Sequence, residues 1–479
     1  MLRCNELYEY GSYFRGSVPL ALAAVSPCAR ERAESCGDGT LGCVTSVVNG
    51  EAWRSLRIRK QECAAQLELV EWWLTHYPVV PLKVSVSLTD DKDSLDTVSL
   101  VEEFSVHLES YGVRFVFCLR LCGIHAPEPF GALLSRAEDV TLHCCTELPS
   151  LDGLDRLRYL KRVNFYACGL TDFSAICTCV LLEDVSFNSC RGLTSLDGLQ
   201  GLQQLKSMDV TKCPVTSLEA LRTCPLLERI TVAFCPALTS LDALKGLRNL
   251  KSVGVTECPV TNLEILLTST SLERFVCHST GEIHLRPLEG LRCLKSIDVF
   301  GGNVLDTDAL HTCTGLETVK IAGAANLISL GGLQSLLFLS RLTINKCGIT
   351  SLDALRTHVT LVELQVYFCG NLTSLQHFKG PPNLKHITIS HCPITSIRSL
   401  NTCVSLQRVN VTSCPLLHSL DGLDGLPSLQ RVYASQSGIT DVVAIAQCPS
   451  LRYVDVRGCA QLQSVDVLLK RGDVEVHYD

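Results

Sequence analysis

The sequence lacks several features that would place it in a common class. Its 479 residues contain no apolar run of about 18 residues, the length that a membrane-spanning helix needs. Its 42 basic and 49 acidic residues are spread along the chain, so no basic patch indicates a nucleic-acid partner. The nearest apolar run to the start, residues 18–25, is short and late for a secretory signal. We therefore expect a cytoplasmic protein without membrane insertion.

Motifs of catalysis and cofactor binding are absent as well. The sequence has no G-x-x-x-x-G-K-[ST], no G-x-G-x-x-G after a strand, no H-E-x-x-H and no G-x-S-x-G. The 13 histidines lack metal-ligand spacing, and the cysteines of residues 1–45 form no C-x₂-C pair. We predict a protein that is not an enzyme and holds no metal or cofactor.

What the sequence does contain is a leucine that returns every 22 or 23 residues. Apolar residues follow it three and five places later, as in Leu250, Val253 and Val255. This alternation is typical of a strand with one buried face, and the period is typical of a leucine-rich solenoid. We predict an α/β solenoid with a curved parallel β-sheet on its concave face and short helical or 3₁₀ returns on its convex face. The repeat leucines are Leu160, Leu182, Leu205, Leu227, Leu250, Leu272, Leu294, Leu316, Leu339, Leu361, Leu384, Leu406, Leu429 and Leu451.

Each return carries a phrase such as Thr-Ser-Leu-Glu-Ala-Leu at residues 216–221. Thr216 and Glu219 have the spacing of a capping box, which predicts that Thr216 caps a short helical turn. One place after the repeat leucine, lysine and glutamate alternate from Lys161 to Glu317. On adjacent parallel strands these side chains should form a ladder of opposite charges.

The chain divides at residue 136 in this interpretation. Residues 137–479 form the repeat array, about 15 units with a C-terminal cap, and residues 1–136 form an N-terminal α/β cap, with degenerate longer repeats as the alternative. The sequence pattern predicts strands at 82–88, 113–121 and 474–478, and helices at 51–76 and 95–111.

The 27 cysteines follow the repeats and do not form a pairing framework. We expect free, buried thiols that bond to the backbone of the neighbouring turn, where short leucine-rich repeats usually place an asparagine. One column lies eight places after the repeat leucine, with Cys145 fitting it as well: Cys168, Cys190, Cys213, Cys235, Cys258, Cys347, Cys369, Cys392, Cys414 and Cys459. A second column lies nineteen places after it: Cys179, Cys224, Cys313, Cys403 and Cys448.

The concave face follows from the same count. Places three and five point into the core, so places two, four, six and seven should face outward. Arginines and aromatic rings recur there, which is the composition of protein-interface hot spots. The opposing interpretation is that Tyr367 and Phe368 only pack over Thr388 and Ser390. The predicted protein-binding residues are Arg341, Tyr367, Phe368, His386, His391, Arg408, Arg431, Tyr433 and Tyr453.

The consensus L-x-x-L-x-V-x-x-C-x-[IVL]-T-S-L covers about two thirds of the chain and resembles the short, 22-residue class of leucine-rich repeats. That class includes a phosphatase regulatory subunit and the internalins, and the cysteine column looks most like trypanosomatid repeat proteins. The resemblance implies a monomeric scaffold or regulatory subunit that binds a protein on its concave face. A cell-surface adhesive or antigenic protein is the alternative, although the integrin-type tripeptide at residues 471–473 is interpreted as a chance occurrence.

Overall fold

The computed structural model describes residues 43–48, 51–58, 82–89, 92–110, 115–151, 157–260, 262–279, 281, 283–301 and 304–479. Its contacts divide the chain into two compact units, residues 1–227 and 228–479. In both units short parallel strands alternate with 3₁₀ turns, so the fold is the predicted leucine-rich repeat solenoid. The predicted boundary at residue 136 remains a prediction.

The first unit contains strands β1 to β8. Strands β1 and β2 are antiparallel and the following pairs, from β2–β3 to β7–β8, are parallel. The strands are β1 (Cys43–Val48), β2 (Glu51–Ile58), β3 (Leu82–Thr89), β4 (Phe115–Cys122), β5 (Ala137–His143), β6 (Arg162–Tyr166), β7 (Asp184–Asn188) and β8 (Ser207–Thr211). The helical segments are α5 (Lys92–Ser110), η2 (Glu128–Phe130), α6 (Gly131–Leu134), η3 (Ser174–Thr178), η4 (Asp197–Leu199) and η5 (Glu219–Thr223).

This unit confirms most predicted elements before the array and corrects one. Strands β3 and β4 and helix α5 lie where the sequence pattern placed two strands and a helix. The predicted helix at 51–76 is wrong over its first eight residues, which form β2. That segment pairs with β1 on one side and β3 on the other, so its backbone groups are used by strand pairing. The rest of the predicted helix, residues 59–76, lies outside the described residues.

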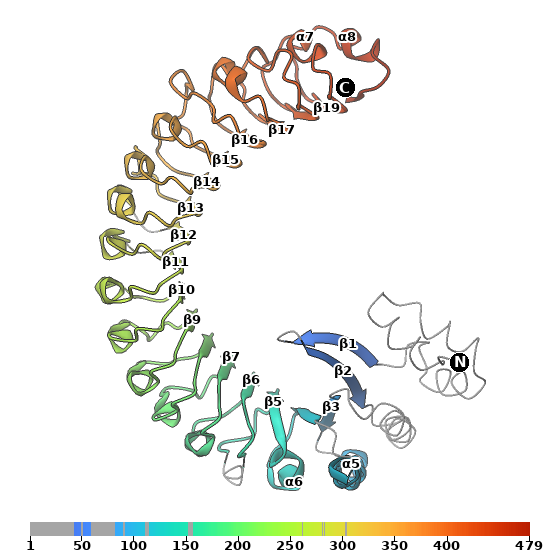
Figure 1. The fold of residues 1–479 in the computed structure, drawn as a ribbon, viewed down its shortest axis with the longest axis vertical. Coiled ribbons are helices and arrows are strands. Elements are labelled where there is room, and N and C mark those ends of the chain that lie inside the picture. The colour runs from blue at the N-terminus through green and yellow to red at the C-terminus, as the bar shows by residue number, and fades with distance from the viewer. Residues whose placement is uncertain are drawn as a thin grey trace, which may run out of the picture. The chain divides into compact units, whose positions relative to one another are not determined.

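The second unit is a regular stack of parallel strands. The return segments, mostly 3₁₀ turns, lie on the side of each repeat opposite its strand (Figure 1). Its strands are β9 (Arg229–Ala233), β10 (Ser252–Thr256), β11 (Arg274–Ser279), β12 (Ser296–Gly301), β13 (Thr318–Ala322), β14 (Arg341–Asn345), β15 (Glu363–Tyr367), β16 (His386–Ser390), β17 (Arg408–Asn410), β18 (Arg431–Tyr433), β19 (Tyr453–Asp455) and β20 (Glu475–His477). Strand β20 confirms the predicted last strand and pairs with β19 in parallel. The returns are η6 (Asp242–Leu244), η7 (Glu264–Thr268), η8 (Arg286–Leu288), η9 (Asp308–Thr312), η10 (Gly331–Leu333), η11 (Asp353–Leu355), η12 (Arg398–Thr402), α7 (Val443–Ala446) and α8 (Asp466–Leu469).

The core is built from the repeat columns. Leu250 is fully buried, and Val253 and Val255, three and five places later, are each 1% exposed. Because neighbouring strands pair in register, each such side chain packs against its counterparts one repeat away. The apolar stack therefore extends with every repeat and does not depend on a central core.

The predicted charge ladder is present on the strands. Lysine amines lie 2.8 and 3.0 Å from glutamates one repeat back in the first unit, at Lys161–Glu138 and Lys206–Glu183. In the second unit the corresponding pairs, Lys251–Glu228 and Lys295–Glu273, measure 3.1 and 2.8 Å. These pairs lie at the solvent-facing surface, so each contributes little to stability and chiefly favours the correct register.

The returns are capped in a different way from the prediction. At η5 the hydroxyl of Ser217, not Thr216, accepts a hydrogen bond from the Glu219 N–H at 3.1 Å. Thr216 instead donates its hydroxyl to the Thr194 carbonyl one repeat back. The same serine contact recurs at η6 and η11, through Ser240 and Ser351. Threonine thus links successive turns, while serine starts each 3₁₀ segment.

Both cysteine columns bond to backbone carbonyls one repeat back, and all cysteines of the described residues are free thiols. In the first column Cys414 Sγ lies 3.2 Å from the Ile389 carbonyl. Ser437 replaces cysteine in the next repeat and donates to the Val411 carbonyl at 2.6 Å. In the second column Cys313 Sγ lies 3.1 Å from the Leu288 carbonyl. A small buried donor therefore suits both columns, and a thiol is such a donor.

Burial also makes the thiols of the second column unreactive. It raises the pKa of Cys179 to about 11 and that of Cys403 to about 12, so both remain protonated at neutral pH. Iodoacetamide at pH 8 should therefore modify exposed Cys144, Cys177 and Cys293 in the folded protein and reach the second-column thiols only in urea. Peptide mass spectrometry would measure this order. Equal modification rates for Cys403 and Cys293 in the folded protein would contradict it.

His358 occupies the second column, nineteen places after Leu339. Its Nε2 lies 2.8 Å from the Leu333 carbonyl, the same contact that Cys313 makes with Leu288. The side chain is 3% exposed, and no partner for its Nδ1 exists among the described residues. Burial lowers the pKa of His358 below its ordinary value of 6.5. The folded protein thus holds this imidazole neutral.

Because the unfolded chain binds that proton more readily, this site should cost stability as the pH falls below about 6.5. We expect His358→Cys to keep the column contact and to reduce the fall in melting temperature between pH 7 and pH 5. Exposed His377→Gln is the matched control and should leave that fall unchanged. Thermal unfolding at the two pH values measures it, and an identical fall in His358→Cys and wild type would contradict the assignment.

Candidate functional site

The strands of the second unit divide their side chains between core and surface as predicted. On β17 and the residue after it, Val409 and Val411 are buried, Arg408 is exposed and Asn410 is half-buried. Places two, four, six and seven therefore form the outward face of the sheet. All nine predicted protein-binding residues lie on this face of the second unit, on strands β14 to β19 or directly after them. Whether they bind a protein remains a prediction.

One group of these side chains surrounds Phe368. Its ring stacks on His391 with centroids 4.2 Å apart, and Lys346 Nζ lies 5.9 Å from the ring centroid. The hydroxyl of Ser390 donates to the Thr412 carbonyl and lies 2.9 Å from His391 Nδ1, so the imidazole N–H donates to it. The Phe368 N–H also donates to the Ser390 carbonyl at 3.0 Å, and packing of the Phe368 ring over Ser390 itself stays a prediction. Phe368 is still 47% exposed.

All three side chains of this group stand at place seven, where the backbone turns left-handed. Lys346, Phe368 and His391 have φ values of 52°, 52° and 57°. Such values are uncommon for residues other than glycine, and here the turn from strand to cysteine column imposes them in repeat after repeat. The turn aligns these side chains in one row, which brings the rings into contact.

A second group forms a ladder of rings across β18, β19 and β20. Tyr433 and Tyr453 have centroids 5.2 Å apart with planes at 41°, and Tyr453 and His477 have centroids 5.1 Å apart at 36°. His477 was missed by the sequence analysis because the repeat that carries it starts at Asp473 and not at a leucine. Its place, four residues after that start and paired with Asp455, would have identified it.

The arginines differ in how their charge is balanced. Arg341 Nε lies 3.9 Å from Glu363 on the next strand. Arg408 and Arg431 lie opposite each other in register on β17 and β18. In the described part of the chain no carboxylate is within ion-pair distance of either guanidinium. Two like charges therefore stand side by side without a counter-charge.

Two predicted residues contribute less than their neighbours to these groups. His386 is half-buried between Glu363 and Arg408 on neighbouring strands. Burial, reinforced by Arg408, lowers its pKa, so it is neutral at pH 7. Tyr367 is half-buried beside Ser390 on the next strand. The structure thus brings Phe368 and His391 together, and Tyr433 and Tyr453 together, while Arg341 lies on β14 with its charge already paired.

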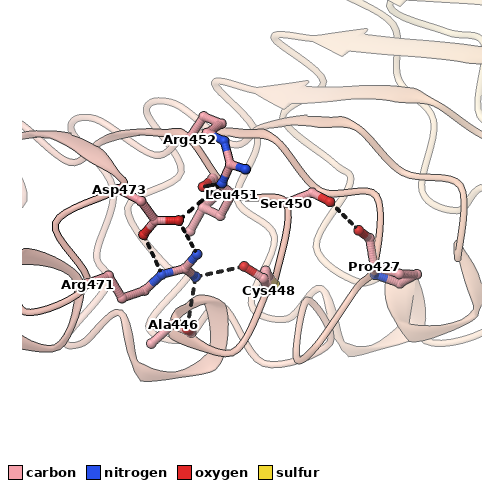
Figure 2. A network of polar contacts seen from close by, with 8 residues as sticks. All are labelled: Pro427, Ala446, Cys448, Ser450, Leu451, Arg452, Arg471 and Asp473. Atoms are coloured by element: carbon pink, nitrogen blue, oxygen red, sulfur yellow. Dashed lines mark hydrogen bonds and ion pairs between the residues drawn. The ribbon is translucent and has the colours of Figure 1, made fainter.

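The integrin-type tripeptide is part of the C-terminal cap, as Figure 2 shows. Arg471 donates to the carbonyls of Ala446 at 3.0 Å and Cys448 at 2.7 Å, which caps the end of α7. Its other nitrogens bind both carboxylate oxygens of Asp473 at 3.1 Å. Arg452 holds the same carboxylate at 3.2 Å. Both charged groups of the tripeptide are therefore engaged within the chain.

The described residues can be compared with the requirements of a metal site and of a membrane span. They contain no cluster of three or more histidine, cysteine or acidic side chains that could hold a metal ion. No helix among them is long and apolar enough to span a membrane. What the outward face provides is a set of fixed rings, hydroxyls and cations, which suits recognition of another molecule.

Comparisons with known proteins agree with the fold. Residues 382–425, which include β16 and β17, match the family of leucine rich repeats in two copies. An internalin of Listeria monocytogenes is 19% identical with a TM-score of 0.50, covering 64% of this chain and 83% of that one. A leucine-rich repeat protein of Leptospira interrogans is 14% identical with a TM-score of 0.58, covering 74% and 93%. No curated protein matches the chain. The chain therefore has the leucine-rich repeat fold.

The structural use of the tripeptide gives a direct test. Arg471→Ala removes two hydrogen bonds from the end of α7 and should lower the free energy of opening of the last repeats by about 1–3 kcal/mol. Exposed Lys470→Ala is the matched control and should have no such effect. Native-state hydrogen exchange over residues 443–479 measures it. Unchanged protection in Arg471→Ala would show that the network contributes no stability.

Proposed function

We propose that the chain is a non-catalytic, cytoplasmic scaffold or regulatory subunit that binds a partner protein on the outward face of its second unit. The observation that carries the proposal is the set of exposed rings directly after β15 and β16 together with the unpaired arginines on β17 and β18. Phe368, Arg408 and Arg431 are exposed and fill no core position. Large rings kept at the surface beside arginine are typical of interface hot spots.

The arrangement is also suited to binding because it is rigid. The rings of Phe368 and His391, and those of Tyr433 and Tyr453, are held against each other before any partner arrives. A partner that lands on them therefore loses less side-chain entropy than it would on freely rotating rings. The strands beneath fix the spacing from one ring to the next.

The alternative is a cell-surface adhesive or antigenic protein. Adhesion through the tripeptide at residues 471–473 would require Arg471 and Asp473 to leave the contacts that cap α7. We therefore favour the scaffold. Localising the endogenous protein distinguishes the two, because a surface position would favour the adhesive role.

The binding face can be tested with a triple variant, Arg408→Glu, Arg431→Glu and Tyr433→Ala. We expect it to lose the partner that wild type captures from its native cell, since it reverses two charges and removes one ring from the face. Quantitative mass spectrometry of affinity-purified complexes measures the loss. Thermal unfolding should stay unchanged, because none of the three side chains is buried.

The matched control is Arg229→Glu, Arg274→Glu and Phe300→Ala, which makes the same changes at exposed positions of the same unit. It should retain the partner. Retention of the partner by the test variant, or equal loss in both variants, would refute the proposed face.

A further inference from the structure

The outward face of β16, β17 and β18 contains no acidic residue. The stretches that carry these strands, places one to seven of each repeat, are residues 385–391, 407–413 and 430–436. No aspartate or glutamate occurs in any of them. Three cations do, at Lys385, Arg408 and Arg431. We call the outward side chains of these three stretches the cationic window.

The charges that border the window are balanced within the chain. On one side Arg341 pairs with Glu363. On the other, Arg457 binds Asp455 with 2.8 and 3.0 Å contacts, and His477 lies 2.8 Å from Glu475. Farther along the same unit Asp298 contacts both His278 and Lys320. Most outward charges of the second unit are compensated in this way, although exposed Arg274 has no ion pair with the described residues, and the window differs because two like charges face each other in it.

The lack of a counter-charge in the window lowers the stability of the folded chain. Arg408 and Arg431 are directly opposite in register on strands about 4.8 Å apart, a placement of like charges that destabilises a sheet. Neither makes an ion pair with the described residues, and on its other side Arg408 lies in register with His386, which is not an acid. A partner anion would remove this repulsion, so the missing counter-charge is expected outside the chain.

The window also offers hydrogen-bond donors to an anion. The side-chain oxygen of Asn410 accepts the Thr412 N–H at 2.9 Å, which turns its amide group outward as a donor. In the described residues that amide donates to no other group. Asn410 lies in register between Thr388 and Tyr433, whose hydroxyls add two more donors. Arginines backed by amide and hydroxyl donors are the usual partners of carboxylates.

We propose, building on the function proposed above, that the cationic window binds an acidic stretch of the partner protein, with its carboxylates on Arg408 and Arg431. An extended segment that crosses the three strands covers about 10 Å, the length of about three residues. A neighbouring apolar side chain of the partner then lies on the ladder of Tyr433 and Tyr453. A protein segment is favoured over nucleic acid because the window is short and is bordered by Glu363 and Asp455, which would repel a longer phosphate backbone.

The test uses the full-length protein and a fluorescein-labelled peptide of ten glutamates, with ten-residue glutamine and lysine peptides as controls. Fluorescence anisotropy should show binding of the glutamate peptide alone, and the binding should weaken as salt rises from 50 to 500 mM. Arg408→Gln with Arg431→Gln should lower the affinity about tenfold, since two charge contacts are lost. The thermal unfolding temperature should not fall, because both side chains are exposed and the variant removes their mutual repulsion.

The control pair is Arg229→Gln with Arg274→Gln, at the same place of the repeat on β9 and β11. It should bind the glutamate peptide as wild type does. An equal loss in both pairs, or no binding of the glutamate peptide by wild type, overturns the inference. Tighter binding of a phosphoserine peptide or of single-stranded RNA, with the same dependence on Arg408 and Arg431, also overturns it.

Capture of the partner from cells distinguishes acidic recognition by the cationic window from the proposed protein-binding function on which it rests. If the glutamine pair keeps that partner while Tyr433→Ala loses it, the protein-binding face stands and the acidic recognition fails. If neither variant nor the triple variant changes capture, both fail. Loss of the partner in the glutamine pair, with competition by the glutamate peptide, supports both.

Discussion

The in-register pairing of parallel strands is the constraint on which the other features of each unit depend. When residue 408 lies beside 431, every other place of one repeat lies beside the same place of the next. A property of one place therefore becomes a column: apolar side chains stack into a core, lysines meet glutamates, and thiols meet carbonyls. The contact between Tyr433 and Tyr453 is diagonal, because Tyr433 lies in register with Asp455 and Tyr453 with Arg431.

At the two cysteine columns, side chains of different chemistry bond to a backbone carbonyl of the preceding repeat. At one column the donor to the preceding repeat is Cys414, and in the next repeat it is Ser437. At the other, Cys313 is replaced by His358 with the same carbonyl contact. What is common is a donor of limited size in a buried place. The abundance of cysteine thus reflects a repeated structural site and is compatible with free thiols throughout the described residues.

The regular part of the fold could be predicted from sequence because a period of 22 or 23 residues fixes both strand positions and buried faces. Prediction failed where a signal was local. Thr216 and Glu219 have capping-box spacing, but stacking commits threonine to the turn before, and Ser217 takes the cap. The sequence pattern predicts a helix over residues 51–58, but these residues form a strand because they pair with β1 and β3. The column count located the nine site residues, yet it could not show that Phe368 stacks on His391 or that His477 extends the ring ladder.

The repeat columns also explain why a binding site is expected where outward charges lack a counter-charge within the chain. A solenoid tolerates almost any residue at an outward place, because neither the apolar stack nor the polar columns depend on it. Most of the second unit's outward charges are nevertheless balanced locally, as at Arg341 with Glu363 and Arg457 with Asp455. Arg408 and Arg431 repel each other and serve no fold requirement. The repulsion between these two arginines is best explained by a contact with a partner that the isolated chain lacks. Because both charges are positive, that partner should be anionic.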